Sequence, residues 1–380
     1  MKVTGAWIER GATQAVCRML TDAGHQALFV GGCVRNALLG VEVADIDIAT
    51  DARPETVARL AGDAGLKPVP TGIDHGTVTV VSDGLPHEVT TFRKDVETFG
   101  RHATVVFSCD VTEDARRRDF TMNALYARPD GTVIDPLGGL ADLRARRVRF
   151  IENPEDRIRE DYLRILRFFR FHAWYGQGGL DPQGLAACAA LAEGVEGLSK
   201  ERLGAETLKL LAAPDPVPAV AAMHESGVLG RVLPGACDRL LAPLVHLEAS
   251  IDAAPDPIRR LAALGGEGVA ERLRLSKAQA RVLARLRAGM DGDAPPAELG
   301  YREGYEAGRD IVLLRAARAG EAVAKAALDD LALGARARFP LTAADLMPAL
   351  NGPALGRRLD ALERRWIASR FALGRDDLLR

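Results

Sequence analysis

The sequence predicts an α+β protein in which a mixed β-sheet domain precedes an all-helical remainder. In about the first 140 residues, short β-branched runs alternate with segments of helical pattern. From about Ile151 onward Ala, Leu and Arg dominate, and apolar residues recur at helical spacing. A chain of 380 residues is long enough for two or three domains with substantial cores. We therefore expect domains at residues 1–145, 146–215 and 216–380.

Five segments of the first domain carry the pattern of β-strands. The first is apolar and ends in a pair of glycines, and the second alternates polar and apolar residues. The third and fourth flank the turn signal Asp83-Gly84, which predicts an antiparallel hairpin. The expected strands are 27–30, 43–49, 77–82, 88–93 and 133–135.

Helices are expected wherever apolar residues recur with a period near 3.6. One of them follows the glycine pair directly and is closed by Gly40. The others lie in the second half of the chain, where glycine and proline mainly mark the breaks. The expected helices include 33–39, 154–174, 201–211, 277–290 and 352–371.

Composition indicates a globular protein without a membrane segment or a signal peptide, so the expected location is cytoplasmic. The five cysteines are scattered and form no C-x-x-C pair, which predicts reduced thiols. A net charge of −2 gives no global sign of nucleic-acid binding. Any such function must therefore depend on local arginine clusters, which occur at 144–149, at 157–170 and at Arg259, Arg260, Arg272 and Arg274.

Two aspartates in V-A-D-I-D-I-A predict a metal site. In a strand, Asp45 and Asp47 lie on one face, while Ile46 and Ile48 point to the other. Carboxylates this close repel each other unless a cation lies between them, and closely spaced hard oxygen ligands suit Mg²⁺, which also binds nucleotide phosphates. Taken alone, the pair is more typical of an edge strand with an exposed polar face.

The segment about ten residues upstream makes a phosphate site the better interpretation. In F-V-G-G-C-V-R, Gly31 and Gly32 let the backbone approach a phosphate where a strand runs into a helix. The helix N-terminus offers free N–H groups, and Arg35 adds a charged donor one turn later. A third carboxylate would complete a two-metal site. Glu88 is the better placed candidate, and Asp119 is its rival.

Several further motifs occur in the same order and with compatible spacing: V-G-G-C-V-R, D-I-D-I-A-T, T-G-I-D-H-G-T-V-T-V, E-V-T-T-F-R, R-R-R-D-F-T-M-N-A-L, D-P-L-G-G, E-D-Y-L-R-I-L-R-F-F-R-F and L-S-K-E-R-L. With them, the chain resembles the bacterial class II CCA-adding enzyme and poly(A) polymerase family. The resemblance implies a nucleotidyltransferase-type mixed β-sheet head followed by a helical neck, body and tail. The head would be catalytic, the neck would carry a base-selecting helix, and the body and tail would bind RNA.

The resemblance also assigns roles to individual residues. Asp45 and Asp47 would hold Mg²⁺, and Gly32 and Arg35 would contact the incoming nucleotide. The remaining residues of the nucleotide pocket would be Arg118, Asp161, Arg164, Arg167 and Arg170.

The pair formed by Asp161 and Arg164 can distinguish bases. On a helix, residues three apart are neighbours, so the two side chains can jointly present an acceptor and donors. Cytosine and adenine match that pattern, whereas guanine and uracil would leave buried polar groups unpaired. The alternative is an ordinary surface ion pair. Glu160 could share this role, and Leu163, Leu166 and Phe169 are expected in the core.

The implied activity is addition of C, C and A to the 3′ end of tRNA from CTP and ATP, with release of pyrophosphate. The alternatives are a poly(A) polymerase or a specialised A-adding or CC-adding enzyme. A catalytically silent RNA-binding protein would be expected to lose D-I-D or R-R-D, and both are intact. A small-molecule nucleotidyltransferase would not need the long basic helical half. No H-D dyad is present, so an additional phosphohydrolase domain is not expected.

Overall fold

A computed structural model describes residues 1–73, 76–99, 102–347 and 349–380. Asp74 and His75 of the T-G-I-D-H-G-T-V-T-V motif therefore lie outside the described residues. The chain forms two compact units. The first unit contains residues 1–206 and 218–232, and the second unit contains residues 207–217 and 233–380. No described helix is both long enough and apolar enough to cross a membrane.

The first unit is built on a mixed seven-stranded sheet with the strand order β3-β4-β5-β2-β1-β8-β9. Strands β2 and β5 pair in parallel, whereas the other neighbours pair antiparallel, so the predicted mixed sheet is confirmed. Two more strands form a separate ribbon. The strands are β1 Leu28–Val30, β2 Asp47–Thr50, β3 Lys67–Gly72, β4 Thr77–Ser82, β5 Leu85–Thr91, β6 Arg93–Phe99, β7 His102–Phe107, β8 Tyr126–Ala127 and β9 Val133–Ile134.

The predicted hairpin is confirmed as β4 and β5. Asp83 and Gly84 have φ values of 48° and 77°, the left-handed pair that a tight two-residue hairpin turn requires. Ser82 lies opposite Leu85, so the second strand begins three residues before the predicted start at Glu88. The turn chemistry therefore sets the register that carries Glu88 to its place in the sheet.

Strand β2 is shorter than predicted, because it begins at Asp47 rather than at Val43. Its neighbour β1 has only three residues and pairs through Leu28 and Phe29, after which the chain turns away at Gly31. On the side of β2 that faces β1, the residues before Asp47 therefore have no strand to pair with. Asp45 precedes the strand and is exposed.

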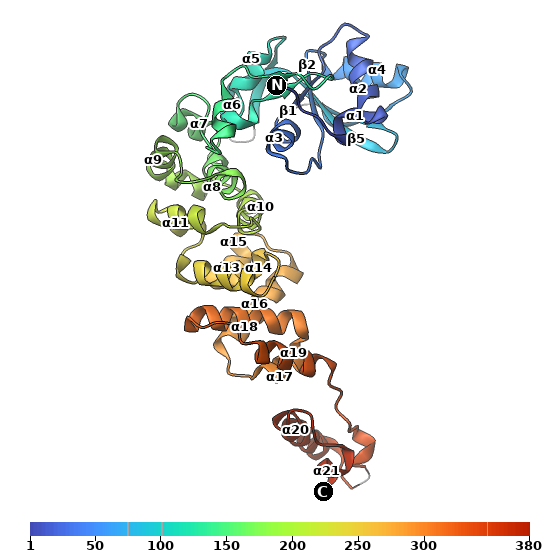
Figure 1. Ribbon diagram of the computed structural model, residues 1–380, viewed down its shortest axis with the longest axis vertical. Helices are drawn as coiled ribbons and strands as arrows, with labels where there is room; N and C mark the ends of the chain where they lie inside the picture. The colour runs from blue at the N-terminus through green and yellow to red at the C-terminus, as the bar shows by residue number, and fades with distance from the viewer. Residues whose placement is uncertain (74–75, 100–101, 348) are drawn as a thin grey trace. The chain divides into compact units, whose positions relative to one another are not determined.

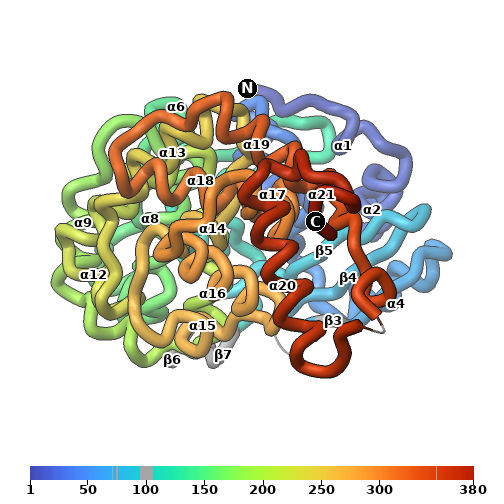
Figure 2. Tube along the Cα trace, turned by 90° about the horizontal axis from the view of Figure 1, so that it is seen from below, coloured from blue at the N-terminus to red at the C-terminus, as the bar shows by residue number. Residues whose placement is uncertain are grey.

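The helices of the first unit pack beside this sheet or follow it. Figure 2 shows α2 and α4 beside β3, β4 and β5, and their apolar faces bury Val16, Leu20 and Val57. In Figure 1 the labelled strands lie in the blue and cyan part of the chain, and only helices are labelled from green to red. The helices as far as residue 232 are α1 Ala6–Glu9, α2 Gly11–Thr21, α3 Gly32–Leu39, α4 Pro54–Asp63, α5 Val111–Arg116, α6 Gly139–Arg144, α7 Pro154–Glu160, α8 Leu163–Tyr175, α9 Pro182–Ala190, α10 Lys200–Leu211, α11 Val217–Glu225 and α12 Val228–Val232.

The predicted single helix 154–174 is wrong, because the chain forms α7 and α8 with a break at Asp161. Asp161 has φ −156° and ψ 105°, which is extended backbone. Its Oδ1 accepts a hydrogen bond from the Leu163 N–H at 3.1 Å, so it satisfies one of the free donors at the start of α8. Its Oδ2 accepts from Arg202 at 2.6 Å. The predicted core residues Leu163, Leu166 and Phe169 are confirmed as buried.

A cluster of phenylalanine rings ties α8 to the segment that follows the sheet. Phe120 lies 5.0 Å from Phe150 and 5.1 Å from Phe171, measured between ring centroids. Phe150 stacks on Phe168 at 5.4 Å. Rings at these separations gain both buried area and favourable quadrupole contacts. This cluster fixes α8 against the loop that contains R-R-R-D-F-T.

The second unit is helical throughout its described residues, as predicted. Helices α17 and α19 cross with small residues in contact, since a side chain at Gly300 or Gly334 would collide with the facing backbone. Trp366 packs against Tyr301, Phe339 and Phe371 in an aromatic core. The helices are α13 Leu241–Ser250, α14 Pro257–Leu264, α15 Val269–Arg272, α16 Lys277–Asp291, α17 Pro296–Glu303, α18 Tyr305–Ala319, α19 Lys325–Arg336, α20 Gly352–Ala368 and α21 Arg375–Leu379.

Two arginines of the second unit correct the sequence analysis. Arg259 and Arg260 were expected in a basic cluster, yet each is only 1% exposed. Both donate to the buried carboxylate of Glu248, at 2.8 and 2.7 Å. Arg260 also donates to the Leu211 carbonyl at 2.7 Å, where α10 ends. They are therefore part of the packed interior.

Candidate active site

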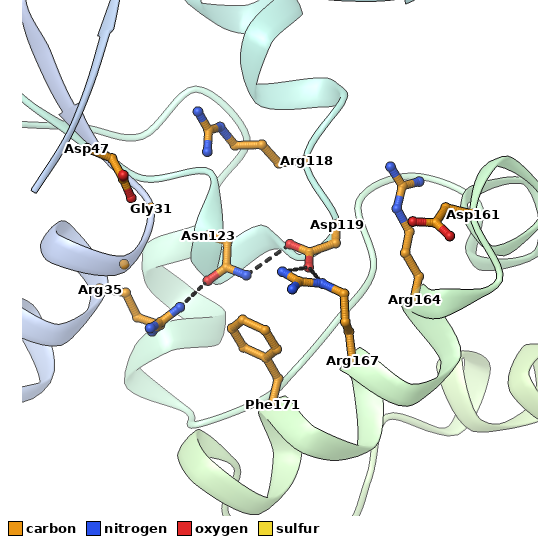
Figure 3. Close-up of a pocket in the computed structure, with 11 residues that line it drawn as sticks. Gly31, Arg35, Asp47, Arg118, Asp119, Asn123, Asp161, Arg164, Arg167 and Phe171 are labelled. Carbon is orange, nitrogen blue, oxygen red and sulfur yellow. Dashed lines mark hydrogen bonds and ion pairs between the residues drawn. The ribbon is translucent and has the colours of Figure 1, made fainter. Parts of the chain in front are cut away.

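A pocket of about 340 Å³ in the first unit gathers most of the predicted site residues (Figure 3). This volume lies within the range of ordinary small-molecule sites. Eight of the predicted residues line it, whereas Asp45, Glu88 and Arg170 do not. The lining residues are Gly31, Gly32, Arg35, Asp47, Arg118, Asp119, Asn123, Asp161, Arg164, Arg167 and Phe171.

The glycine turn has the geometry of an anion site. Gly31 caps α3 with φ 69° and ψ −117°, a conformation open to glycine but strained for other residues. Helix α3 then runs from Gly32 to Leu39 and ends at Gly40, whose φ of 68° is the usual left-handed stop. The predicted strand–turn–helix unit is confirmed. It presents the free N–H groups of the first turn to the pocket.

The carboxylates gather beside that turn on two neighbouring strands. Asp47 opens β2, and Glu88 lies opposite it in the parallel register with β5. Ile46 and Ile48 are buried, as the alternation of the D-I-D segment predicts. Burial, and then the nearby charges of Glu88 and Asp45, raise the pKa of Asp47 to about 6 despite the opposing effect of Arg118 and Arg35. The negative charges of Asp45, Asp47 and Glu88 are therefore not fully balanced by the nearby arginines.

Asp119, the rival for the third carboxylate, is already occupied. Its Oδ1 accepts from the Asn123 amide at 2.9 Å, and its Oδ2 accepts from Arg167 at 2.7 Å. Burial alone would raise the pKa of Asp119, but Arg167 and Asn123 hold this pKa at about 2. Among the described residues, no three acidic, histidine or cysteine side chains come together closely enough to hold a metal ion by themselves.

A chain of hydrogen bonds crosses the pocket from α3 to α8 (Figure 3). Arg35 donates to the side-chain oxygen Oδ1 of Asn123 at 2.6 Å, and the side-chain NH2 of Asn123 donates to Asp119. Asp119 then forms an ion pair with Arg167 at 2.6 Å. The middle of this chain is buried, so each link is worth more than it would be in water.

The arginines of the pocket differ in what neutralises them. Arg118 pairs with the buried Asp114 at 2.9 Å, and Arg164 pairs with Glu160 at 2.5 Å. Within the described ranges, Arg35 has no carboxylate at ion-pair distance, and its hydrogen bonds go to the neutral groups of Asn36, Asn123 and Tyr175. Burial lowers the pKa of Arg35, as expected for a desolvated cation. The positive charge of Arg35 is therefore available to an anionic ligand.

The predicted pairing of Asp161 with Arg164 on one helical face is wrong. Asp161 lies outside both helices and binds Arg202, while Arg164 lies in the first turn of α8 and donates to Glu160 and to the Arg157 carbonyl. Both side chains nevertheless line the pocket. They reach it from separate segments rather than from one helical face.

Arg170 faces a different partner. Its Nε donates to Glu206 at 2.5 Å, and its guanidinium lies 4.4 Å from the Phe171 ring centroid. It does not line the pocket. The drift of a three-residue spacing around the helix accounts for this, because each step turns the side chain by about 60°.

Asn123 and Phe171 line the pocket although the sequence analysis did not single them out. Asn123 lies four residues after Asp119 in R-R-R-D-F-T-M-N, and Phe171 lies four residues after Arg167. For Phe171, the helical spacing was a usable signal. For Asn123 no local pattern existed, since Thr121–Asn123 forms an isolated 3₁₀ turn.

The fold and this pocket define the class of protein. Residues 27–149 match the Poly A polymerase head domain, and residues 179–240 match the probable RNA and SrmB-binding site of polymerase A. The mitochondrial CCA tRNA nucleotidyltransferase 1 of Danio rerio is 33% identical over 373 residues, which are 92% of this chain and 85% of that protein. The chain therefore belongs to the class II CCA tRNA nucleotidyltransferase and poly(A) polymerase family.

Other relatives match over shorter lengths. The CCA-adding enzyme of Levilactobacillus brevis is 40% identical over 62% of this chain, and the human mitochondrial CCA tRNA nucleotidyltransferase 1 is 41% identical over 52%. The chain matches 60% of the length of the first of these proteins and 46% of the second.

The likeness to solved structures extends over nearly the whole chain. The crystal structure of the Bacillus stearothermophilus CCA-adding enzyme in complex with CTP gives a TM-score of 0.72 at 28% identity, covering 95% of this chain and 94% of that one. The Thermotoga maritima CCA-adding enzyme complexed with tRNA gives a TM-score of 0.72 at 18% identity, over 100% of this chain and 97% of that one, which supports the fold alone.

Proposed function

We propose that this protein adds C, C and A in turn to the 3′ end of tRNA, using CTP and ATP and releasing pyrophosphate, with the cytoplasm as its expected compartment. The observation that carries the proposal is the pocket itself, which joins a glycine turn, Asp47 and the buried cation Arg35 to two polar side chains suited to reading a base, Asp161 and Arg164. Family membership supports it, because the named relatives are CCA-adding enzymes.

Mg²⁺ fits the chemistry of the acidic group. Asp45 and Asp47 offer hard oxygen ligands, and the raised pKa of Asp47 marks a site where a cation would relieve repulsion. Two carboxylates with phosphate oxygens and water supply the kind of ligand set that Mg²⁺ prefers. When bound, Mg²⁺ would favour ionisation of the RNA 3′-hydroxyl and neutralise charge on the triphosphate.

The chain's own residues would orient the reacting groups. The first turn of α3 and Arg35 would bind the triphosphate, so that the α-phosphorus faces the 3′-hydroxyl beside Asp45 and Asp47. Arg118, held by Asp114 from the far side, would place a second guanidinium on the same anion. Positioning and electrostatics would therefore supply most of the rate.

Base choice would depend on the carboxylate of Asp161 and the guanidinium of Arg164. Cytosine and adenine each present an amino donor beside a ring-nitrogen acceptor, which these two groups complement. Guanine and uracil would set acceptor against acceptor and leave buried groups unpaired. Arg202 restrains Asp161 through its 2.6 Å ion pair, so the acceptor has a defined position.

The tRNA would be held through its phosphates by exposed arginines of the second unit. On α20, Arg357 and Arg364 are seven residues apart, as are Arg358 and Arg365, so the four lie along one side of the helix. All four are exposed, and none is ion-paired within the described residues. Such contacts position RNA without reading its sequence.

One experiment separates this function from its alternatives. The protein is incubated with Mg²⁺ and a tRNA that ends before its CCA, with CTP and ATP supplied separately and together, and the products are resolved at single-nucleotide length. Growth by C, C and A followed by arrest is expected. A long A ladder would instead indicate a poly(A) polymerase, and a single permitted base a specialised enzyme. A tRNA with a blocked 3′-hydroxyl is the control, because it must remain unextended.

A further inference from the structure

Tyr175, at the C-terminal end of α8, contacts the buried cation of the pocket. Its hydroxyl oxygen accepts a hydrogen bond from Arg35 Nη2 at 2.9 Å, and its ring centroid lies 4.0 Å from the centre of the Arg35 guanidinium. The Phe171 ring lies 5.1 Å from the same guanidinium. Both aromatic contacts are within the distance at which a ring face attracts a cation.

These contacts matter because, among the residues that the structure describes, Arg35 is held by neutral groups alone. The side chain is 7% exposed, and its remaining hydrogen bonds go to the amide oxygens of Asn36 and Asn123. A carboxylate in place of Tyr175 would neutralise the charge, whereas an aliphatic residue would leave it desolvated and loosely placed. A phenol stabilises the cation and fixes its direction without cancelling its charge.

The position of Tyr175 on α8 connects it to the other end of the pocket. Arg164, Arg167, Phe171 and Tyr175 follow one another at spacings of three, four and four residues, so they form one stripe of the helix. The first two lie toward the end of the pocket that contains Asp161. The last two hold Arg35, which lies on α3 beside the glycine turn.

We propose that Tyr175 is a positioning residue, which holds the Arg35 guanidinium against the triphosphate and so sets the affinity for CTP and ATP alike. The inference rests on the proposed function, because it deepens the role of that same pocket. Since Tyr175 acts on the phosphate end and not on the base, its removal weakens both nucleotides by the same factor. The contribution is made on binding the nucleotide rather than in the chemical step, so it is expressed in KM.

The test compares Tyr175→Leu, Tyr175→Phe and the parent protein in single-nucleotide addition with CTP and with ATP. Tyr175→Leu is expected to raise both KM values roughly tenfold, with kcat changed by less than about twofold. Tyr175→Phe keeps the ring and is expected to recover part of the loss. Trp174→Leu, which removes a 41% exposed aromatic side chain from the same helix, is the matched control and should behave like the parent.

A double-mutant cycle measured by equilibrium binding of CTP separates positioning from a general effect on the fold. In an Arg35→Met background, Tyr175→Leu is expected to change the Kd by less than about twofold, because its effect passes through Arg35. Additive effects, a KM change for only one nucleotide, or a Tyr175→Leu variant equal to the parent would each overturn the proposal. A parent that binds CTP but adds nothing to tRNA would contradict the proposed function, while the binding cycle would still test Tyr175.

Discussion

Arg35 and Arg118 line the same pocket but are stabilised in opposite ways. Arg118 forms an ion pair with Asp114 and hydrogen-bonds Tyr126, whereas Arg35 has amides, a phenol and aromatic rings around it. A guanidinium that is already ion-paired adds little net charge to the pocket and mainly offers hydrogen-bond donors in a fixed direction. A guanidinium without a carboxylate partner keeps its net charge and attracts an anion. The two residues are thus suited to different tasks on an anionic ligand.

Replacing Asp47 by Asn tests whether its charge serves function rather than folding. Burial and the repulsion from Glu88 disfavour the ionised carboxylate, so the folded protein loses no stabilising ion pair when the charge is removed. We expect Asp47→Asn to abolish nucleotide addition and to leave the Tm equal to or above that of the parent. Thermal denaturation and the tRNA extension assay check this. A Tm several degrees lower, or substantial remaining activity, would rule the interpretation out.

Asp114 is the opposite case, because its charge stabilises the fold. Burial alone would raise the pKa of Asp114, but Arg118 and Arg117 hold this pKa well below its usual range. A carboxylate whose pKa is lowered in the folded state stabilises the protein at pH values above its unfolded-state pKa of 3.8. That contribution is lost as the pH falls through the folded-state pKa. Asp114→Asn is expected to cost about 3–5 kcal/mol at pH 7.

The pH dependence of this variant provides the check. The difference in Tm between the parent and Asp114→Asn should stay constant from pH 7 to about pH 5 and narrow below about pH 4, since only the parent has the carboxylate to protonate. Denaturation series across this range measure it. A difference that stays constant down to the lowest accessible pH would mean that the loss is steric and not electrostatic.

The break between α7 and α8 sets the geometry of the pocket end that contains Asp161 and Arg164. An uninterrupted helix would have placed Asp161 and Arg164 about 60° apart on one surface. In the folded protein, Asp161 accepts a hydrogen bond from the Leu163 N–H at the start of α8 and is held by Arg202, while Arg157 donates from α7 to the carbonyl of Arg118 at 2.8 Å. The break therefore brings Asp161 and Arg164 to the pocket from two separate segments.

Removing the acceptor at this break should relax base choice. With Asp161→Ala, uracil no longer faces an opposing acceptor, so we expect the ratio of kcat/KM for UTP to that for CTP to rise roughly tenfold. The variant Asp156→Ala removes an exposed carboxylate from α7 and is the control. Extension of tRNA with each of the four nucleotides in turn measures the ratio. An unchanged ratio would remove Asp161 from base selection.

The pocket lies in the first compact unit, whereas a buried ion-pair network lies in the second. Arg259 and Arg260 share the carboxylate of Glu248, and Arg259 also pairs with Asp310 at 2.6 Å. A buried network of this kind contributes little compared with apolar packing, yet losing one member leaves an unpaired charge. The second unit therefore depends on every member of the network being present.

Truncation of Arg260 should destabilise the second unit and spare the pocket. Arg260→Ala leaves Glu248 with one partner and the carbonyl of Leu211 without its donor, so the free energy of unfolding is expected to fall by about 3–5 kcal/mol. Arg285→Ala removes a partly exposed ion pair with Glu303 and should cost less than about 1 kcal/mol. Urea denaturation measures both changes. Loss of CTP binding in Arg260→Ala under native conditions would contradict the separation.

Much of the fold was predictable because its signals are local. A two-residue turn at Asp83-Gly84 and a left-handed stop at Gly40 follow from backbone sterics, and the helices of the second half follow from periodicity. The same holds for the glycine turn beside D-I-D. Alternation also predicts that Ile46 and Ile48 point away from their acidic neighbours, and both are buried, whereas Asp45 is exposed and Asp47 is half-buried.

Long-range partners decided the rest. The helix predicted at 154–174 is interrupted because Asp161 forms an ion pair with Arg202, which lies 41 residues further along the chain. Arg260 is buried because Glu248 and the carbonyl of Leu211, 49 residues earlier in the chain, accept its hydrogen bonds. Arg35 and Tyr175 are 140 residues apart, and no local pattern connects them. Sterics and periodicity act over a few residues, whereas the partner of a charge is set by which segments pack together, so only the tertiary structure could assign these contacts.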